Sequence, residues 1–192
     1  MQELKERIVK EGKVLPGNII KVDGFLNHRI DTGLLTRIAE EFGKYFNMDE
    51  VTMVLTAEAS GIALATAVAT YFHKPMIFAK KAKSDNIEGG LYQSDIYSYT
   101  YKKKVTLLVS KEWLSPDDKV LIIDDFMANG EAMRGLCDIV TAAGATLMGI
   151  GCAVEKGFQG GGDRLRAAGV NLKSLAIIES AEPGNIVFRD DD

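Results

Sequence analysis

The stretch "VLIIDDFMANGEAM", residues 120–133, combines an apolar run, an acidic pair and a short turn that leads toward a predicted helix. Its four consecutive apolar residues are typical of a strand buried on both faces, as in a parallel sheet covered by helices. Asp124 and Asp125 follow at the point where such a strand leaves the core. Because ligands of open α/β sheets bind at the carboxyl ends of the strands, this stretch predicts both a fold class and a site.

Strand and helix signals alternate along most of the chain. Strands are predicted at residues 51–56, 75–81, 119–125, 146–155 and 174–180, and helices at residues 59–72, 130–144 and 163–169. Near-continuous apolar strands that alternate with helices predict an α/β fold with a parallel sheet flanked by helices. The length of 192 residues favours one domain that spans residues 1–192.

Other segments depart from this alternation. In residues 1–11 and 31–46 the apolar residues recur at the spacing of one helix face, so each segment predicts a helix. Asp31 or Thr32 is suited to cap the second of these helices. Residues 15–30 between them predict irregular chain with short extended pieces.

The segment 94–109 has aromatic residues at every second position, Tyr97, Tyr99 and Tyr101, and therefore predicts an antiparallel strand or hairpin. The polar loop before it, residues 82–93, is expected to be mobile.

Composition excludes several function classes. The net charge of -4 and the pI near 5.3 argue against a broad nucleic-acid surface. No apolar run approaches the roughly 20 residues of a membrane helix, and the first residues lack the pattern of a secretory signal. We therefore expect a cytoplasmic protein that binds neither nucleic acid nor membrane. Cys137 and Cys152 have no CxxC spacing and are expected to be reduced packing residues, without a metal site made by protein side chains alone.

The turn after the acidic pair offers unpaired backbone N–H groups at a helix N-terminus, which favour an anion. It lacks the Lys of a Walker A loop and the spaced glycines of a dinucleotide site. Acids followed closely by a phosphate cradle favour a sugar phosphate, whose hydroxyl groups donate to the carboxylates. The alternative is an ordinary helix N-terminus whose acids bind nothing.

The apolar run, the Asp-Asp pair and the Gly-containing loop resemble the phosphoribosyl pyrophosphate (PRPP) signature of the type I phosphoribosyltransferases. Within that class, "ANGEA" at 128–132 resembles the bacterial xanthine phosphoribosyltransferases. The similarity extends to "LPGNIIKVDGFLNHRID", "EASGIALA" and "CAVEKGFQGGGDRL". It implies a parallel-sheet core with an antiparallel flexible-loop hairpin and a small hood formed by about 1–35 and 154–192.

The resemblance also implies roles for the residues that contact PRPP. Asp124 and Asp125 are implied as catalytic residues that accept hydrogen bonds from the ribose hydroxyls, with direct contact to Mg²⁺ as the alternative. The 5-phosphate is expected on Ala128, Asn129, Gly130, Glu131 and Ala132, and the pyrophosphate on Ala57, Glu58, Ala59 and Ser60. For Glu131 we predict that the backbone N–H binds phosphate while the carboxylate faces away.

At the base, Ile20, Asn27 and Lys156 are implied to contact xanthine. Because Lys only donates hydrogen bonds, Lys156 favours a 6-oxopurine over adenine. Phe25 and Phe158 are candidate stacking faces or core residues.

Lys81 and Lys83 are implied to belong to a loop that closes over the reacting centre. A solvated basic edge is the alternative for these two lysines.

The implied reaction transfers phosphoribosyl from PRPP to N9 of xanthine and forms xanthosine 5'-monophosphate and diphosphate in purine salvage. Mg²⁺ is expected to bind mainly through PRPP, and the protein is expected to be a homodimer. Two alternatives stay open: another 6-oxopurine as the acceptor, or a regulator that senses PRPP without catalysis.

Overall fold

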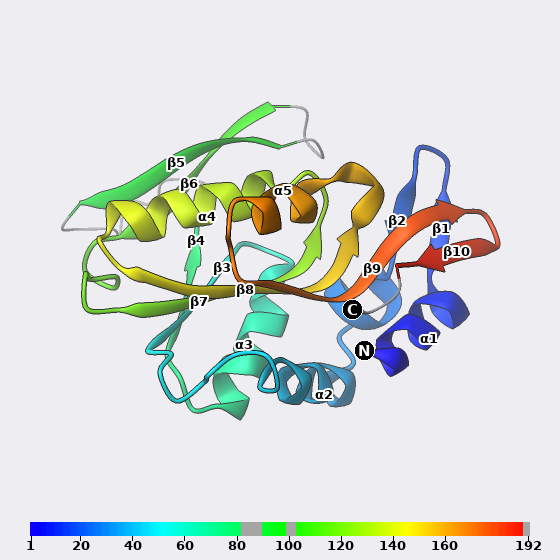
Figure 1. The fold of residues 1–192 in the computed structure, drawn as a ribbon, viewed down its shortest axis with the longest axis horizontal. Coiled ribbons are helices and arrows are strands. Elements are labelled where there is room, and N and C mark those ends of the chain that lie inside the picture. Colours follow the sequence, from blue (N-terminus) through cyan, green and yellow to red (C-terminus); the bar gives the residue numbers. More distant parts are fainter. Residues whose placement is uncertain (82–89, 99–102, 190–192) are drawn as a thin grey trace.

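The computed structural model describes residues 1–81, 90–98 and 103–189, and a six-stranded sheet forms its centre (Figure 1). In spatial order the strands are β10 (Asn185–Phe188), β9 (Leu172–Glu182), β8 (Thr146–Lys156), β7 (Lys119–Met127), β3 (Met53–Ala57) and β4 (Met76–Ala79). Neighbours from β9 to β4 are parallel, whereas β10 pairs antiparallel with β9. The predicted α/β architecture with a mainly parallel sheet is confirmed.

Helices cover both faces of this sheet (Figure 1). They are α1 (Gln2–Glu11), α2 (Thr32–Phe42), α3 (Gly61–Tyr71), α4 (Glu131–Ala142) and α5 (Gly161–Ala167). Leu121 and Ile123 of β7 pack in the apolar cluster that contains α1, α2 and α3, while Val120 and Ile122 pack in the cluster that contains α4. All four side chains are 0% exposed, so the apolar run is buried on both faces, as predicted.

A separate antiparallel hairpin, β5 (Leu91–Ser98) and β6 (Lys103–Ser110), packs on α4. Gly135 makes the close approach possible, because a Cβ there would lie 2.5 Å from Cγ2 of Ile96. The predicted hairpin is confirmed. Tyr99, Tyr101 and most of the predicted mobile loop lie outside the described residues.

The N-terminal segment contains two short strands, β1 (Lys13–Leu15) and β2 (Ile19–Lys21), and a π-helical turn, Asp23–Asn27. The expected short extended pieces are therefore present. Asp31 caps α2, since its Oδ1 accepts a hydrogen bond from the Leu34 N–H at 3.0 Å.

The N-terminal and late segments of the chain lie side by side (Figure 1). The Met1 ammonium donates to the Leu175 carbonyl of β9 at 2.6 Å, and Nζ of Lys156 donates to the Asn18 carbonyl between β1 and β2 at 3.2 Å. This is the arrangement expected of a hood. The assignment of residues 1–192 to one domain stays a prediction.

Candidate active site

A cavity of about 470 Å³ lies at the carboxyl ends of β3, β7 and β8. The predicted site residues in its lining are Ile20, Asn27, Ala57, Glu58, Ser60, Lys81, Asp124, Asp125, Ala128, Asn129, Gly130, Glu131, Ala132 and Lys156. Ala59 is not part of the lining, and Lys83 lies outside the described residues. The fold thus brings segments that are far apart in sequence to one edge of the sheet.

The acidic pair lies within β7, which continues to Met127, so both acids are buried in the strand and not at the point where it leaves the core, and they already accept hydrogen bonds. Asp124 is 6% exposed and Asp125 is 1% exposed. Asp125 Oδ1 accepts from the Ser60 hydroxyl at 2.9 Å, and its Oδ2 accepts from the Asn27 amide at 2.7 Å. Asp124 Oδ1 accepts from the Asp125 backbone N–H at 3.0 Å. Burial, with the neighbouring charge of Asp125, raises the pKa of Asp124 well above its ordinary value.

The first residue of α3 packs directly on this pair. A Cβ at Gly61 would overlap Oδ1 of Asp124 and Oγ1 of Thr56. Only glycine therefore lets α3 start this close to the acids.

The turn between β7 and α4 has the geometry of an anion site. Gly130 has a φ of 78°, in the left-handed region that glycine adopts without steric cost. The first N–H groups of a helix have no intrahelical acceptor, and within the described residues no side chain caps this end of α4. Since residues 128–132 line the cavity, these N–H groups are available to a bound phosphate.

The Glu131 carboxylate has a partner on its own helix. Its Oε2 lies 3.2 Å from Nη2 of Arg134, a residue outside the cavity lining. Arg134 also bonds Asp138 at 2.7 Å and the Asp95 carbonyl at 2.8 Å, which fixes it against β5. The acid is thus neutralised by Arg134, while contact between the Glu131 N–H and phosphate stays a prediction.

The loop after β3 is tied to the chain that follows β4. Oε1 of Glu58 accepts from the Lys81 backbone N–H at 2.5 Å, and the Glu58 N–H donates to the Ala79 carbonyl at 3.0 Å. This contact holds the Glu58 carboxylate and brings the start of the lysine-containing loop to the cavity.

Lys156, Ile20 and Phe126 line the same cavity. Nζ of Lys156 donates to the Asn18 carbonyl and lies 5.5 Å from the centroid of the Phe126 ring. Burial lowers the pKa of Lys156. An ammonium has three donors, so one bond to Asn18 leaves donors for a ligand.

The aromatic residues that line the cavity, Phe126 and Tyr97, are not the two that the sequence suggested. Phe25 is 0% exposed in the core, and Phe158 packs against the same core. Phe126 lines the cavity instead, because β7 continues past the acidic pair to Met127. Its position immediately after Asp125 is the sequence signal that would have found it.

Among the described residues, no group of three or more His, Cys, Asp or Glu side chains is placed to hold a metal ion. The cavity does contain the carboxylates of Glu58, Asp124 and Asp125. Mg²⁺ typically binds through one or two carboxylates and the phosphates of a substrate, while it keeps several waters. These oxygen donors fit an ion that arrives with a phosphorylated substrate.

Comparison with known proteins identifies the family. Residues 28–168 match the model of the phosphoribosyl transferase domain. The chain is 52% identical over 193 residues to a xanthine phosphoribosyltransferase of Lachnoclostridium phytofermentans, covering 100% of both chains. It is also 52% identical over 192 residues to a xanthine phosphoribosyltransferase of Bifidobacterium longum, covering 98% of this chain and 100% of the relative. The chain belongs to the xanthine phosphoribosyltransferases.

Solved structures with the same fold place this xanthine phosphoribosyltransferase chain in a wider class. An adenine phosphoribosyltransferase of Giardia lamblia in complex with 9-deazaadenine has a TM-score of 0.77 at 20% identity, covering 93% of this chain and 98% of that chain. An adenine phosphoribosyltransferase of Trypanosoma brucei has a TM-score of 0.72 at 22% identity, covering 91% and 79%. The predicted type I phosphoribosyltransferase fold is confirmed.

Sequence reasoning missed the hairpin's contribution to the site of this xanthine phosphoribosyltransferase. Ile96 and Tyr97 of β5 line the cavity, as does Met133 of α4. Contacts of this kind depend on how β5 folds over α4, so the local pattern gives no sign of them. The period-two tyrosine spacing predicted a strand but not which ligand it would face.

Proposed function

We propose that the protein transfers the 5-phosphoribosyl group of PRPP to N9 of xanthine and releases xanthosine 5'-monophosphate and diphosphate in purine salvage. One observation carries the proposal: a single cavity contains the helix N-terminus at residues 128–132, the acids Asp124 and Asp125, and Lys156. These groups suit, in that order, a sugar phosphate, its hydroxyls and a purine carbonyl. The full-length similarity to xanthine phosphoribosyltransferases supports xanthine as the acceptor.

The donor is proposed to lie across the ends of β3 and β7. Its 5-phosphate accepts backbone hydrogen bonds from Ala128, Asn129, Gly130, Glu131 and Ala132, and its diphosphate lies on Ala57, Glu58, Ala59 and Ser60. Its ribose hydroxyls donate to Asp124 and Asp125. Because Ser60 and Asn27 already donate to Asp125, the hydroxyls either join these donors or replace them.

Catalysis is proposed to depend on positioning and electrostatics. As the bond to diphosphate weakens, positive charge develops near the anomeric carbon, and the two aspartates below the ribose stabilise it. N9 of the base then attacks the anomeric carbon from the side opposite the departing diphosphate, without a covalent enzyme intermediate. When Mg²⁺ is bound with the donor, it supplies charge neutralisation to the leaving diphosphate.

The base is proposed to lie between Ile20, Phe126 and Lys156. The Lys156 ammonium donates to a purine carbonyl and cannot accept from the amino group of adenine, so a 6-oxopurine is favoured. Asn27 or a backbone N–H is proposed to address the second carbonyl that distinguishes xanthine from hypoxanthine. Guanine and hypoxanthine are the alternative acceptors.

Lys81 and Lys83 are proposed to belong to a lid that closes over the reacting centre and excludes water. Support comes from Lys81, which lines the cavity and whose backbone is bonded to Glu58.

We also propose that the protein is a homodimer, as the family resemblance implies. A groove of about 480 Å³ beside β4 includes the exposed side chains of Phe78 and Trp113, and it is a candidate for the buried surface.

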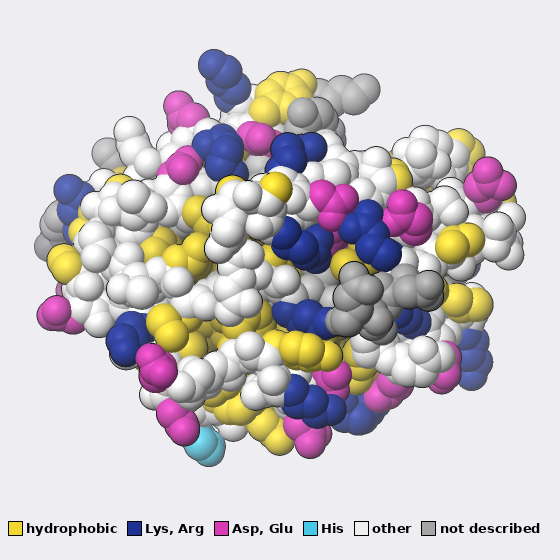
Figure 2. Space-filling view, in the orientation of Figure 1, with side chains coloured by type: hydrophobic (Ala, Val, Ile, Leu, Met, Phe, Trp, Pro, Cys, Tyr) yellow, Lys and Arg dark blue, Asp and Glu magenta, His cyan; other side chains and the backbone are white. Residues whose placement is uncertain are grey.

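A regulator that senses PRPP is the alternative from another function class. Such proteins usually need a basic face for nucleic acid. On the face shown in Figure 2, Lys and Arg side chains are interspersed with Asp and Glu side chains.

Within the described residues, no helix is long and apolar enough to cross a membrane. A cytoplasmic location stays a prediction.

The test is an assay with PRPP, Mg²⁺ and either xanthine, guanine, hypoxanthine or adenine, in which nucleotide and diphosphate are both measured. The proposal expects the highest kcat/KM for xanthine and equal amounts of the two products. Donor binding without consumption of any base would support the regulator instead.

A further inference from the structure

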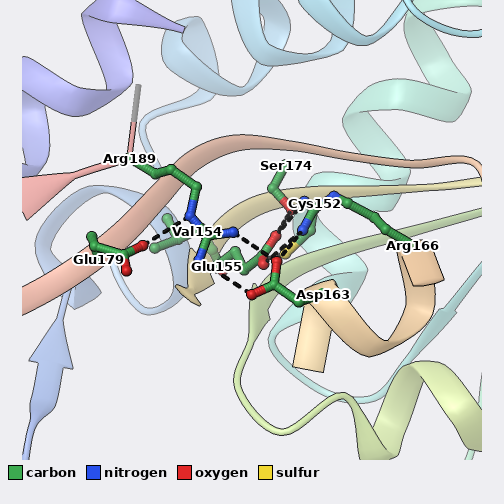
Figure 3. A network of polar contacts seen from close by, with 8 residues as sticks. All are labelled: Cys152, Val154, Glu155, Asp163, Arg166, Ser174, Glu179 and Arg189. Atoms are coloured by element: carbon green, nitrogen blue, oxygen red, sulfur yellow. Dashed lines mark hydrogen bonds and ion pairs between the residues drawn. The ribbon is translucent and has the colours of Figure 1, made fainter. Parts of the chain in front are cut away.

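The buried carboxylate of Glu155 on β8 is bonded to side chains of α5 and β9 (Figure 3). Glu155 is 0% exposed, and Arg166 of α5 donates to its Oε1 at 3.0 Å and its Oε2 at 2.7 Å. The Ser174 hydroxyl of β9 also donates to Oε2. A buried charge is tolerated only when it is paired and hydrogen-bonded, so these contacts hold α5 firmly against β8 and β9.

A second, outer set of ion pairs fixes the same helix (Figure 3). Asp163 accepts two hydrogen bonds from Arg189, at 2.6 and 3.2 Å, and Arg189 also donates to Glu179 of β9 at 2.8 Å. The hydrogen bonds from Arg189 lower the pKa of Asp163. Helix α5 is therefore anchored through Arg166 of its last turn on the buried side and through Asp163 of its first turn on the exposed side.

The first turn of α5 lies against the backbone of the phosphate loop. A Cβ at Gly161 would lie 2.6 Å from the carbonyl carbon of Asn129 and 2.7 Å from the nitrogen of Gly130. A Cβ at Gly162 would overlap the Glu155 carboxylate. The two glycines thus let α5 lie between the buried carboxylate and the loop with no space to spare.

One side chain of α5 bonds the loop itself. Nη2 of Arg164 donates to the Asn129 carbonyl at 3.0 Å. In a trans peptide the C=O and N–H point in opposite directions, so holding this carbonyl also fixes the direction of the Gly130 N–H. The Asn129 carbonyl therefore faces Arg164 of α5, and the Gly130 N–H on the other side of the same peptide points away from Arg164.

The strand register places this support beside the start of the phosphate loop. Glu155 of β8 pairs with Met127 of β7. The next residues along the two strands are Lys156, at the base end of the cavity, and Ala128, the first residue of the phosphate loop.

We propose that Glu155, Gly161, Gly162, Arg164 and Arg166 form a loop seat that sets the geometry of the phosphate loop, and that Arg164 is a positioning residue for PRPP. The inference rests on the proposed function. The loop has neither Lys nor hydroxyl side chains, so its affinity for phosphate depends on backbone N–H groups that point correctly before the ligand arrives. Arg164 fixes the direction of the Gly130 N–H by holding the Asn129–Gly130 peptide.

The test compares Arg164→Met with Arg164→Lys, which retains a donor for the Asn129 carbonyl. Arg37→Met is the matched control, because Arg37 is also an exposed helical arginine and its hydrogen bonds go to Glu3, and neither residue lines the cavity. Binding of PRPP with Mg²⁺ is measured by calorimetry, KM is measured for PRPP and for xanthine, and thermal unfolding is followed for each variant.

We expect Arg164→Met to weaken PRPP binding on the order of tenfold, as for loss of a charged hydrogen-bond donor. The KM for xanthine and the unfolding temperature should stay close to wild type, and Arg164→Lys should recover most of the lost affinity. Unchanged PRPP affinity in Arg164→Met, or an equal loss in Arg37→Met, overturns the proposal. If the wild type neither binds PRPP nor forms nucleotide, the proposed function itself fails.

A backbone variant tests the same seat without removing a charge. Gly161→Ala is expected to push the Asn129–Gly130 peptide and raise the KM for PRPP more than that for xanthine. Gly33→Ala in α2 is the control, since a Cβ there meets only the flexible end of Arg37 at 3.3 Å and the Asp31 carboxylate at 3.5 Å. Equal effects on both substrates in Gly161→Ala would count against a seat specific to the phosphate loop.

Discussion

The buried position of Asp124 suits its proposed role in ligand binding but lowers the stability of the fold. Burial and the charge of Asp125 raise its pKa above the ordinary value of 3.8. When folding raises the pKa of a group, its contribution to stability is fully present at a pH below the pKa of the unfolded state. This contribution is lost as pH rises through the higher pKa of the folded state. At neutral pH this carboxylate therefore reduces the free energy of unfolding.

We predict that Asp124→Asn makes the protein more stable at pH 7 by about 1 kcal/mol, the usual scale for relief of a functional-site conflict. The gain should shrink as pH falls toward 3.8, the ordinary aspartate value. Turnover should fall at least about tenfold, because a charge that stabilises the transition state is lost. Urea unfolding at several pH values measures the first effect. Equal stability of the two proteins across the pH range would contradict it.

Lys156 gives a prediction about substrate choice. Lys156→Ala should raise the KM for xanthine about 10- to 100-fold, since a hydrogen bond to a charged group is removed. PRPP affinity should be nearly unchanged, because the Lys156 ammonium contacts the Asn18 carbonyl and the Phe126 ring and is not one of the backbone groups proposed to hold phosphate. Steady-state kinetics with each substrate varied in turn measures both effects, and Lys156→Arg should keep part of the xanthine activity. Loss of PRPP binding in Lys156→Ala would show that the base end has been misplaced.

At the scale of elements, the start of α3 is held against the acids of β7. Gly61→Ala should destabilise the protein by about 1–3 kcal/mol, the usual cost of overpacking, because its Cβ overlaps Asp124 and Thr56. It should also weaken PRPP binding, since the displaced group is Asp124. Thermal unfolding and calorimetry check the two effects, with Gly33→Ala in α2 as the control. A Gly61→Ala protein with native stability and native affinity would contradict this packing.

Local patterns predicted most elements and missed those that depend on distant contacts. The apolar run at residues 120–123 predicted β7, a cap and helical periodicity predicted α2, and the alternation of strand and helix signals predicted α4. β10 was not predicted, because its four residues are only partly buried and gain their order from pairing with β9. The close packing of the first residues of α5 was not predicted either: Gly161 and Gly162 are buried against the phosphate loop and Glu155.

For the whole molecule, the proposed homodimer predicts a change in mass. Trp113 is 60% exposed in the groove beside β4, and Trp113→Glu is expected to shift the protein from dimer to monomer in light scattering. A charge placed in an apolar interface is strongly unfavourable. Val9→Glu is the control, because Val9 is similarly exposed, at 61%, on α1 outside this groove. A wild type that is monomeric, or a Trp113→Glu protein that remains dimeric, would contradict this choice of interface.

One part of the site could be predicted from the residues themselves, and the other part only from the family resemblance. The acids and the phosphate loop follow from the end of one buried strand and the N–H groups of one helix, so their chemistry was visible in residues 120–133. The base end joins Ile20, Asn27 and Lys156 across more than half of the chain, and only the family resemblance selected them. Contacts such as Asn27 with Asp125 and Glu58 with Lys81 required the folded chain.

The central claim is that this cavity transfers phosphoribosyl from PRPP to xanthine in preference to other purines. The most direct measurement supplies equal concentrations of xanthine, guanine, hypoxanthine and adenine with a limiting amount of PRPP and Mg²⁺, and quantifies each nucleotide formed. We predict that xanthosine 5'-monophosphate is the main product and that adenosine monophosphate is absent. A product mixture dominated by any other nucleotide, or no nucleotide at all, would contradict the account.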